Sequence, residues 1–569
     1  MFVAPALAVL GLGFVVPLIV VIYVSFSQAD GFGLAAYREV ASSPVFADIL
    51  WRTVKMALGC TAIAALIAYP FAHVLATRLN RFAPLILALV SVPYLTSILI
   101  RSYAWVAVLG GNGLVNRALI STGLIDYPIT LIYNPFGSYI GTIHIMLPLM
   151  ILPIYAAMRR IDPSLMRAAA ALSAGPVSAF FTVWLPLTIS GVVAGSLLVF
   201  LNVLGFYVTP ALLGAPGDYL IAQAIEVRVS TLGEFGVASA LSTILLVLVG
   251  TCLLLARDRI FAGSSMSAFT TNASAGSSGR GLTSGLLSRA GAALLRSLSG
   301  IETGMARVLG AVGVPYAALV LLFLLLPMVV VVVISFSADP FLSFPPKTYG
   351  LRWFDAFFAD SRWTSALFFS LVMALVSSAT AVLVSTPFTL ALSRSEFRGV
   401  KALWLLALAP MILPNIVIGL GLFFSFVSLR LNGHPISFWI AYTTIGIPYV
   451  VIILGAAFDR FDIGLERAAI SLGASPATAF RTVTFPILAM SFATAFLFAF
   501  LMTFDELIIG LFLSSPQTTP LPVRMWEDIR MEISPKTAAV GTLQLAVLVG
   551  AIVASVLYRW WGTRKNVAT

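Results

Sequence analysis

The sequence predicts an all-α membrane protein built from two parallel six-helix transmembrane halves. Only 10% of its 569 residues are charged and 60% are hydrophobic, whereas a soluble domain carries about 25% charged residues. The long apolar runs are continuous, which favours helices over the alternating strands of a membrane β-barrel. A 32-residue segment also occurs twice, at 156–187 and 456–487, with 16 identical positions. These observations together predict a duplicated polytopic membrane protein.

Twelve apolar runs are long enough to cross a hydrocarbon core, since a crossing takes about 20 helical residues. We interpret the first run as a span and not as a signal peptide, because no basic residue follows Met1 and no small-residue cleavage site ends the run. The predicted spans lie near 4–27, 53–77, 84–109, 138–158, 186–205, 237–256, 312–336, 364–392, 402–428, 437–457, 485–504 and 538–559.

The Lys and Arg residues predict the orientation of these spans. If both termini face the cytoplasm, 20 of the 33 Lys and Arg residues and 7 of the 22 acidic residues lie on the cytoplasmic side. Cytoplasmic loops of membrane proteins carry an excess of Lys and Arg, so this topology is favoured. It places both copies of the repeated segment in the cytoplasm, and it explains the net charge of +11 without a nucleic-acid partner.

The repeat divides the chain into a first half at 1–256 and a second half at 308–569. Residues 257–307 between them are rich in Ser, Gly and Arg, which is typical of a flexible cytoplasmic linker. Both halves keep the same span order, so the repeat is parallel and predicts a transport pathway where the halves meet. The prolines that match are Pro70 and Pro387, Pro93 and Pro410, and Pro148 and Pro448.

Each copy of the repeated segment predicts a short amphipathic helix, at 163–173 and 463–473. Asp162 followed by Pro163 is typical of an N-cap and a first turn, and Asp462 begins the second copy. Small alanines allow close approach to a partner surface, and an arginine can pair with its acidic groups. The candidate docking residues are Asp162, Leu165, Arg167, Ala168, Ala169, Leu172 and Gly175 in the first copy, and Asp462, Leu465, Glu466, Arg467, Ala468, Ala469 and Gly473 in the second.

This segment resembles the EAA loop of the permease subunits of ATP-binding-cassette importers, which is broadly Glu-Ala-Ala, then a glycine, then a hydrophobic-Pro turn. Copy two has Arg-Ala-Ala at 467–469 with Gly473 and places Glu466 one position early, whereas copy one has Ser173 in place of the glycine. In that family the loop forms a coupling helix in a groove of the ATPase subunit. The resemblance therefore implies two ATPase partners that bind ATP and Mg²⁺, an extracytoplasmic substrate-binding protein, and a place in the bacterial inner membrane.

Other segments resemble one branch of that family. Residues 99–126 and 206–229 are similar to one permease subunit of spermidine/putrescine-type importers, and residues 503–535 are similar to the other. The resemblance covers both halves, which implies that two permease subunits are fused in this chain. Related permeases also serve iron(III), thiamine, opines and aminophosphonates. The resemblance favours a polyamine or a related amine as the solute, with these other solutes as alternatives.

Candidate pathway residues cluster near the ends of the third, fifth and eleventh predicted spans. Asp505 and Glu506 end the eleventh span, where carboxylates are costly enough to suggest a task such as holding an amine. Aromatic rings attract a cation by roughly 0.5 to 2 kcal/mol each, although such residues are also common at membrane interfaces. Arg101 would repel an amine unless an acid such as Asp126 neutralises it, and it suits a phosphonate or carboxylate. The candidate rings are Tyr103, Trp105, Phe206 and Tyr207.

Several motifs are missing from the sequence. It contains no G-x-x-x-x-G-K-[ST], no HExxH, no paired CxxC and no GxSxG. We therefore expect no catalytic, cofactor or metal site, and we expect ATP hydrolysis on another chain that drives alternating access. The three histidines are isolated, and Cys60 and Cys252 lie in apolar runs. A secondary transporter with two six-span halves is the main alternative class, and a membrane enzyme is a weaker one.

Overall fold

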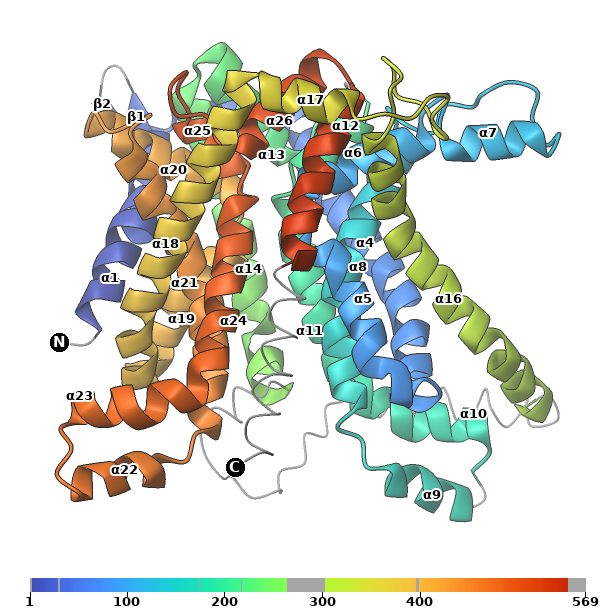
Figure 1. The fold of residues 1–569 in the computed structure, drawn as a ribbon, viewed down its shortest axis with the longest axis vertical. Coiled ribbons are helices and arrows are strands. Elements are labelled where there is room, and N and C mark those ends of the chain that lie inside the picture. Colours follow the sequence, from blue (N-terminus) through green and yellow to red (C-terminus); the bar gives the residue numbers. More distant parts are fainter. Residues whose placement is uncertain are drawn as a thin grey trace.

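The computed structural model describes residues 3–28, 31–172, 174–215, 217–263, 302–395 and 399–550, and these residues are largely helical (Figure 1). The first half contains α1 (Ala4–Leu10), η1 (Gly11–Val15), α2 (Val16–Phe26), β1 (Ser27–Gln28), β2 (Gly31–Phe32), α3 (Ala35–Ser42), α4 (Pro44–Thr77), η2 (Asn80–Phe82), α5 (Ala83–Leu95), α6 (Ile98–Leu109), α7 (Leu114–Ser121), α8 (Pro135–Met158), α9 (Pro163–Ala171), α10 (Pro176–Ala179), η3 (Phe180–Trp184), α11 (Leu185–Leu204), α12 (Val208–Leu213), α13 (Ile221–Val227), η4 (Arg228–Leu232) and α14 (Phe235–Gly263). The strands β1 and β2 pair in antiparallel fashion.

The second half repeats this order of helices. It contains α16 (Glu302–Ser335), α17 (Arg352–Ala359), α18 (Ser361–Ser393), α19 (Val400–Ile412), α20 (Asn415–Ser428), α21 (Pro435–Arg460), α22 (Ile463–Ser471), α23 (Pro476–Ala479), η5 (Phe480–Thr484), α24 (Phe485–Phe504), α25 (Ile508–Leu513) and α26 (Leu521–Met531). A last helix begins at residue 535 and is described as far as residue 550. Residues 264–301 of the predicted linker lie outside the described part, and both flanking ends of that linker are helical.

Helices occupy all twelve predicted spans as far as the structure describes them. Ten described helices are long and apolar enough to cross a membrane, or eleven if the bent pair α19–α20 is one span. The prediction of a continuous helix is nevertheless wrong for the third span of each half. The first half breaks between α5 and α6, and the second half bends by 97° between α19 and α20.

Local chemistry explains both breaks. Leu413 precedes Pro414, and a residue before proline is disfavoured in the helical region, so Leu413 has ψ 146°. In the first half, Pro93 has no backbone N–H to donate, and Thr96 directs its hydroxyl to the Pro93 carbonyl at 2.7 Å and takes ψ 157°. Each break exposes backbone groups inside the membrane region, where they are tolerated only if protein or a cavity surrounds them.

The first span of each half packs against the other half. The N-terminal span, α1 to α2, contacts α18, α20 and α21, whereas α16 contacts α4, α5 and α6 (Figure 1). The α16 contacts include hydrogen bonds from Tyr316 Oη to the Ile67 carbonyl at 2.8 Å and between His144 Nε2 and the Leu324 carbonyl at 3.0 Å. The two halves are therefore interlocked, and a continuous core crosses between them.

The two ends of the molecule carry different elements. Both copies of the repeated segment, with α9 and α10 in one and α22 and α23 in the other, lie at the same end (Figure 1). The opposite end carries α7, α13, α17, α26 and the β1–β2 pair (Figure 1). The spans α11 and α24 run from the repeated segments toward the middle of the molecule, so they connect that end to the interface between the halves.

Candidate functional site

The repeated segments form the two predicted short helices, α9 and α22. Asp162 Oδ1 accepts the Ser164 N–H and Asp462 Oδ1 accepts the Gly464 N–H, both at 2.8 Å, so both predicted N-caps are present. The Ser164 hydrogen bond lowers the pKa of Asp162. Both helices end two residues before the predicted boundary, at Ala171 and Ser471.

The turn after each helix is closed by the same backbone hydrogen bond. The Ala174 N–H donates to the Ala169 carbonyl at 3.0 Å, and the Ala474 N–H donates to the Ala469 carbonyl at 3.1 Å. Gly473 has φ +93°, a left-handed conformation that favours glycine. Ser173, the corresponding residue of the first copy, lies outside the described residues.

Most candidate docking residues are exposed at this end of the molecule. Leu172 and Leu472 are 84% and 90% exposed, which is unusual for leucine and leaves an apolar surface available to a partner. The exposed candidates are Asp162, Leu165, Arg167, Ala168 and Leu172, with Asp462, Leu465, Arg467, Ala468 and Gly473. Ala169 is buried, and Gly175 and Ala469 are half-buried. Glu466 is only 6% exposed, so it adds nothing to the exposed surface at this end, and its part in ATPase coupling stays a prediction.

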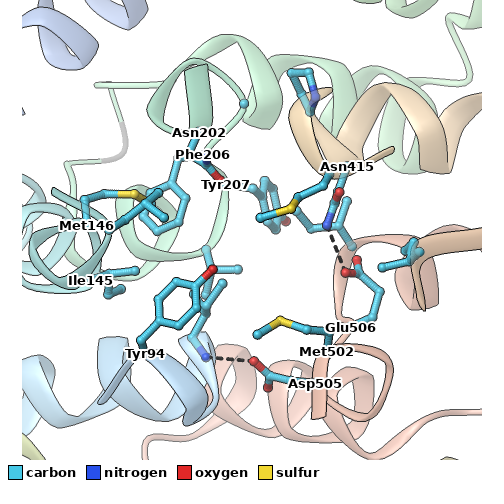
Figure 2. A pocket seen from close by; sticks show the side chains of 18 of the residues that line it. Tyr94, Ile145, Met146, Asn202, Phe206, Tyr207, Asn415, Met502, Asp505 and Glu506 are labelled. Atoms are coloured by element: carbon cyan, nitrogen blue, oxygen red, sulfur yellow. Dashed lines mark hydrogen bonds between the residues drawn. The ribbon is translucent and has the colours of Figure 1, made fainter. Parts of the chain in front are cut away.

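A cavity of about 190 Å³ lies where the two halves meet, at the level of the broken third spans (Figure 2). Residues of α5, α6, α8 and α11 line it from the first half, and residues of α19, α20, α21 and α24 line it from the second. Figure 2 shows that Tyr94 points its hydroxyl into the cavity, with Met146 and Met502 on different sides of it.

The two candidate carboxylates border this cavity, and each is hydrogen-bonded. Asp505 Oδ2 accepts the N–H of Ile98, the first residue of α6 in the other half, at 3.1 Å. Glu506 accepts a hydrogen bond from the Asn415 side-chain amide at 2.9 Å (Figure 2). It also accepts one from the Ile509 N–H at 3.1 Å. The first N–H groups of a helix have no partner within the helix and carry partial positive charge. The break before α6 thus creates the donor that Asp505 satisfies.

Only some of the predicted aromatic residues reach the cavity. Phe206 and Tyr207 line it. Tyr103 does not, because its hydroxyl donates to the Ser534 carbonyl at 2.8 Å and its ring is fully buried. Trp105 instead packs against His144 and Phe323, with ring centroids 5.5 and 5.3 Å away. Tyr103 and Trp105, two of the four candidate rings, therefore do not line this cavity.

Arg101 lines the cavity and is 2% exposed. Its Nε donates to the Ser97 carbonyl at 3.4 Å, and its Nη1 has no hydrogen-bond partner among the described residues. Asp126, named above as an acid that could neutralise it, is exposed and does not line the cavity. Asp505 is the acidic group that interacts electrostatically with Arg101. Arg101 thus lines the same cavity as the carboxylates of Asp505 and Glu506.

Residues 385–567 match the family described as "Binding-protein-dependent transport system inner membrane component". The chain is also 35% identical over 243 residues to the spermidine/putrescine transport system permease protein PotB of Haemophilus influenzae, a match that covers 41% of this chain and 85% of that protein. The chain belongs to this family of permeases. It is a multi-pass inner-membrane transport subunit of an ATP-binding-cassette importer, which sets aside the secondary-transporter and membrane-enzyme alternatives.

Two further comparisons match less than half of the chain. The putrescine transport system permease protein PotI of Escherichia coli is 29% identical over 233 residues, covering 40% of this chain and 83% of that protein. A chain of a bacterial ABC transporter involved in the import of the acidic polysaccharide alginate is 16% identical with a TM-score of 0.36, over 45% of the permease and 96% of that chain.

Sequence analysis missed several cavity residues of the permease. Tyr94, Tyr449, Asn202 and Asn415 line the cavity but were not among the candidates. Tyr94 follows Pro93, and Asn415 follows Pro414, so the prolines near each helix break were the available signal. Among the described residues, no group of three His, Cys, Asp or Glu side chains could hold a metal ion.

Proposed function

We propose that this permease is a fusion of two permease subunits, at 1–256 and 308–569, that imports a polyamine or a related amine. The observation that carries the proposal is the cavity between the halves, where Asp505 and Glu506 face a space that Tyr94, Phe206 and Tyr207 also line. Carboxylates bind ammonium groups through charge-assisted hydrogen bonds, and aromatic faces attract cations. The names of the similar proteins PotB and PotI, which refer to spermidine and putrescine, support this solute class.

The size and charge of the cavity suit transport better than tight binding. Its volume of about 190 Å³ is several times the ~30 Å³ that one water occupies in the liquid, which suits a slender solute. Arg101 lies beside the carboxylates and weakens their hold on a cation. A transport site must bind its solute strongly enough to admit it and weakly enough to release it. The mixed charge of the cavity meets this requirement.

Transport in this proposal uses alternating access driven by partner chains. Two ATPase subunits, which bind ATP and Mg²⁺, dock on α9 and α22, and a substrate-binding protein delivers the solute at the opposite end. The exposed Leu172 and Leu472 and the arginines Arg167 and Arg467 supply the docking surface. Both termini and the segment between the halves are then cytoplasmic, in agreement with the excess of Lys and Arg at the end that carries α9 and α22. Closure of the ATPases moves α9 and α22, and the cavity changes the side to which it opens.

Uptake by the reconstituted importer tests the proposal. Proteoliposomes that contain the permease with its ATPase subunits and binding protein are expected to take up labelled putrescine or spermidine when ATP is present. The double variant Asp505→Asn with Glu506→Gln is expected to lose that uptake, with unchanged assembly on size-exclusion chromatography. Equal uptake by this variant would contradict a role for the carboxylates, and absence of amine uptake by the native importer would contradict the solute.

One observation favours a second solute class. The unpartnered Nη1 of Arg101 in the cavity suits a carboxylate or phosphonate, as in an opine or an aminophosphonate. The variant Arg101→Gln separates the two possibilities. If the solute is a simple amine, this variant is expected to bind it more tightly, and the KM for uptake falls. If the solute carries an acid group, the KM rises.

A further inference from the structure

Glu466 is tied to the body of the second half by three hydrogen bonds. Arg394 Nη1 donates to Oε1 at 2.9 Å and Nη2 donates to Oε2 at 2.6 Å, so the guanidinium binds the carboxylate in a bidentate manner. Thr484 Oγ1 donates to Oε2 at 2.8 Å. The three residues come from α22, from the turn that follows α18, and from the end of η5, where α24 begins. One carboxylate therefore joins the docking helix to two membrane spans.

This contact is built as a structural joint. The Glu466 side chain is 8% exposed and that of Arg394 is 30% exposed. Burying a charged side chain is costly unless an opposite charge pairs with it in good hydrogen-bond geometry. A bidentate Arg–carboxylate salt bridge provides that geometry. Because all three donors approach the carboxylate from the protein, Glu466 is turned away from any docking partner. The hydrogen bonds from Arg394 lower the pKa of Glu466, so it stays charged at neutral pH.

The first half has none of the three residues. Met166 stands in place of Glu466, Thr77 in place of Arg394 and Trp184 in place of Thr484. Met166 packs against the apolar core, and Trp184 packs against His73 with ring centroids 5.1 Å apart. The first half does carry a cytoplasmic arginine contact, from Arg159 to Asn80 at 2.9 Å. That contact joins the end of α8 to η2 and leaves the docking helix α9 out.

The asymmetry continues along α24. This helix begins next to Thr484 and ends next to Asp505 and Glu506 at the cavity. Its 20 residues span about 30 Å at 1.5 Å per residue. The half that ties its docking helix to the spans is thus also the half that brings both carboxylates to the cavity. In the first half the equivalent helix, α11, ends at Leu204 and is followed by Gly205.

We propose that Glu466 and Arg394 are positioning residues that form a strut, through which movement of α22 passes along α18 and α24 to the carboxylates of the cavity. The strut makes the second half the stiffer of the two, whereas the matching residue of α9, Met166, packs against the apolar core and offers no carboxylate. The proposal rests on the proposed function, because it takes α22 to be a docking site for an ATPase.

Hydrogen exchange of the detergent-solubilised permease alone tests the strut without any partner. The variant Glu466→Ala is expected to speed amide exchange across 463–471 by about tenfold, with exchange across 163–171 unchanged, because a lost joint lowers the local opening free energy. The charge-exchanged pair Glu466→Arg with Arg394→Glu is expected to restore most of the protection. Unchanged exchange in Glu466→Ala would overturn the strut, even if the permease transports nothing.

The assembled importer tests the transmission of movement. Glu466→Ala and Arg394→Ala are each expected to lower the number of solute molecules imported per ATP hydrolysed at least about threefold, with the charge-exchanged pair recovering. The matched control is Asn80→Ala, which removes the arginine contact of the first half and is expected to leave the ratio unchanged. If exchange becomes faster and the ratio stays native, the joint is structural only and the proposal fails. If the native importer does not transport, the proposed function fails instead.

Discussion

The two halves follow the same chain path through the membrane but carry different chemistry where they meet. In one interface the end of α24 meets the break before α6, and Asp505 accepts the N–H of Ile98 at 3.1 Å. In the equivalent interface the end of α11 meets the break before α20, and Gly205 packs so closely on Pro414 that an added Cβ would clash with the proline ring. The contact of Asp505 with Ile98 is a hydrogen bond, whereas the contact of Gly205 with Pro414 is close apolar packing.

The same difference recurs at the docking end. The second half uses a buried salt bridge between Glu466 and Arg394, and the first half uses apolar packing of Met166. The two halves thus share the same order of helices but carry different side chains at these matching positions. The second half carries charge at both ends of α24, and the first half supplies close packing and an aromatic wall. We infer that α9 and α22, which are nearly equal in length, have unequal roles in the proposed transport cycle.

The largest expected effect on uptake comes from making the polar interface at Asp505 resemble the apolar interface at Gly205. The variant Asp505→Gly removes a cavity carboxylate and leaves the Ile98 N–H without its acceptor. We expect the kcat/KM for amine uptake to fall about 100-fold, which corresponds to about 2.8 kcal/mol. Asp505→Asn keeps an acceptor oxygen and loses the charge, so uptake by this control separates the two contributions. Native uptake in Asp505→Gly would mean that the polar interface has no part in transport.

The reciprocal change at the apolar interface is expected to act through packing. In Gly205→Ala the new Cβ meets Pro414, and overpacking of this kind costs about 1 to 3 kcal/mol. The permease is expected to melt at a lower temperature in detergent and to lose uptake in proportion. Asn202→Ala, which removes another polar cavity residue from α11 without adding an atom, is the control for altered cavity chemistry. A melting temperature equal to that of the native chain would show that the two halves do not meet closely at Gly205.

Local chemical signals were sufficient to predict part of this architecture. Asp162 and Asp462 cap helices where a polar residue precedes an amphipathic stretch, and the twelve apolar runs locate the spans, because each of these features depends on residues close in sequence. The third spans were predicted as continuous since hydropathy does not register the effect of Pro414 on Leu413. Attention to the proline would have revealed that break and the cavity beside it.

The remaining features depend on neighbours that are distant in sequence. Asp505 and Ile98 are bonded although 407 positions separate them, and hydropathy does not say which spans are adjacent. For the same reason, the sequence does not predict that α16 packs against the first half and that the N-terminal span packs against the second half. Tyr103 and Trp105 are candidates as aromatic faces for a cation, but helix geometry turns Tyr103 away from the face of α6 that carries Arg101 and places Trp105 further along the helix.

Acid is expected to weaken α22 more than α9. Arg394 lowers the pKa of Glu466 in the folded chain, so its salt bridge stabilises the fold fully above the ordinary glutamate pKa of about 4.3. That contribution is lost as the pH falls through the lowered folded pKa. Amide exchange across 463–471, corrected for the intrinsic effect of pH, is expected to lose more protection below about pH 4 than exchange across 163–171, where acid protonates the Asp162 cap. In Glu466→Gln the two segments should respond alike, and a pH effect that persists there would assign it to another group.

The smallest expected effect comes from replacing Gly473 of the second copy with serine, the residue that the first copy has at position 173. Gly473 has φ +93°, and a residue with a side chain in this conformation costs about 1 kcal/mol. Gly473→Ser is therefore expected to speed exchange across 463–474 about fivefold, less than the loss of the Glu466 joint, because the turn closes the helix end while the salt bridge anchors its middle. Uptake should change less than twofold, since Gly473 is exposed and a Cβ added there would meet no atom of the described residues within 4 Å. Exchange as fast as in Glu466→Ala would mean that the turn, and not the salt bridge, fixes the position of α22.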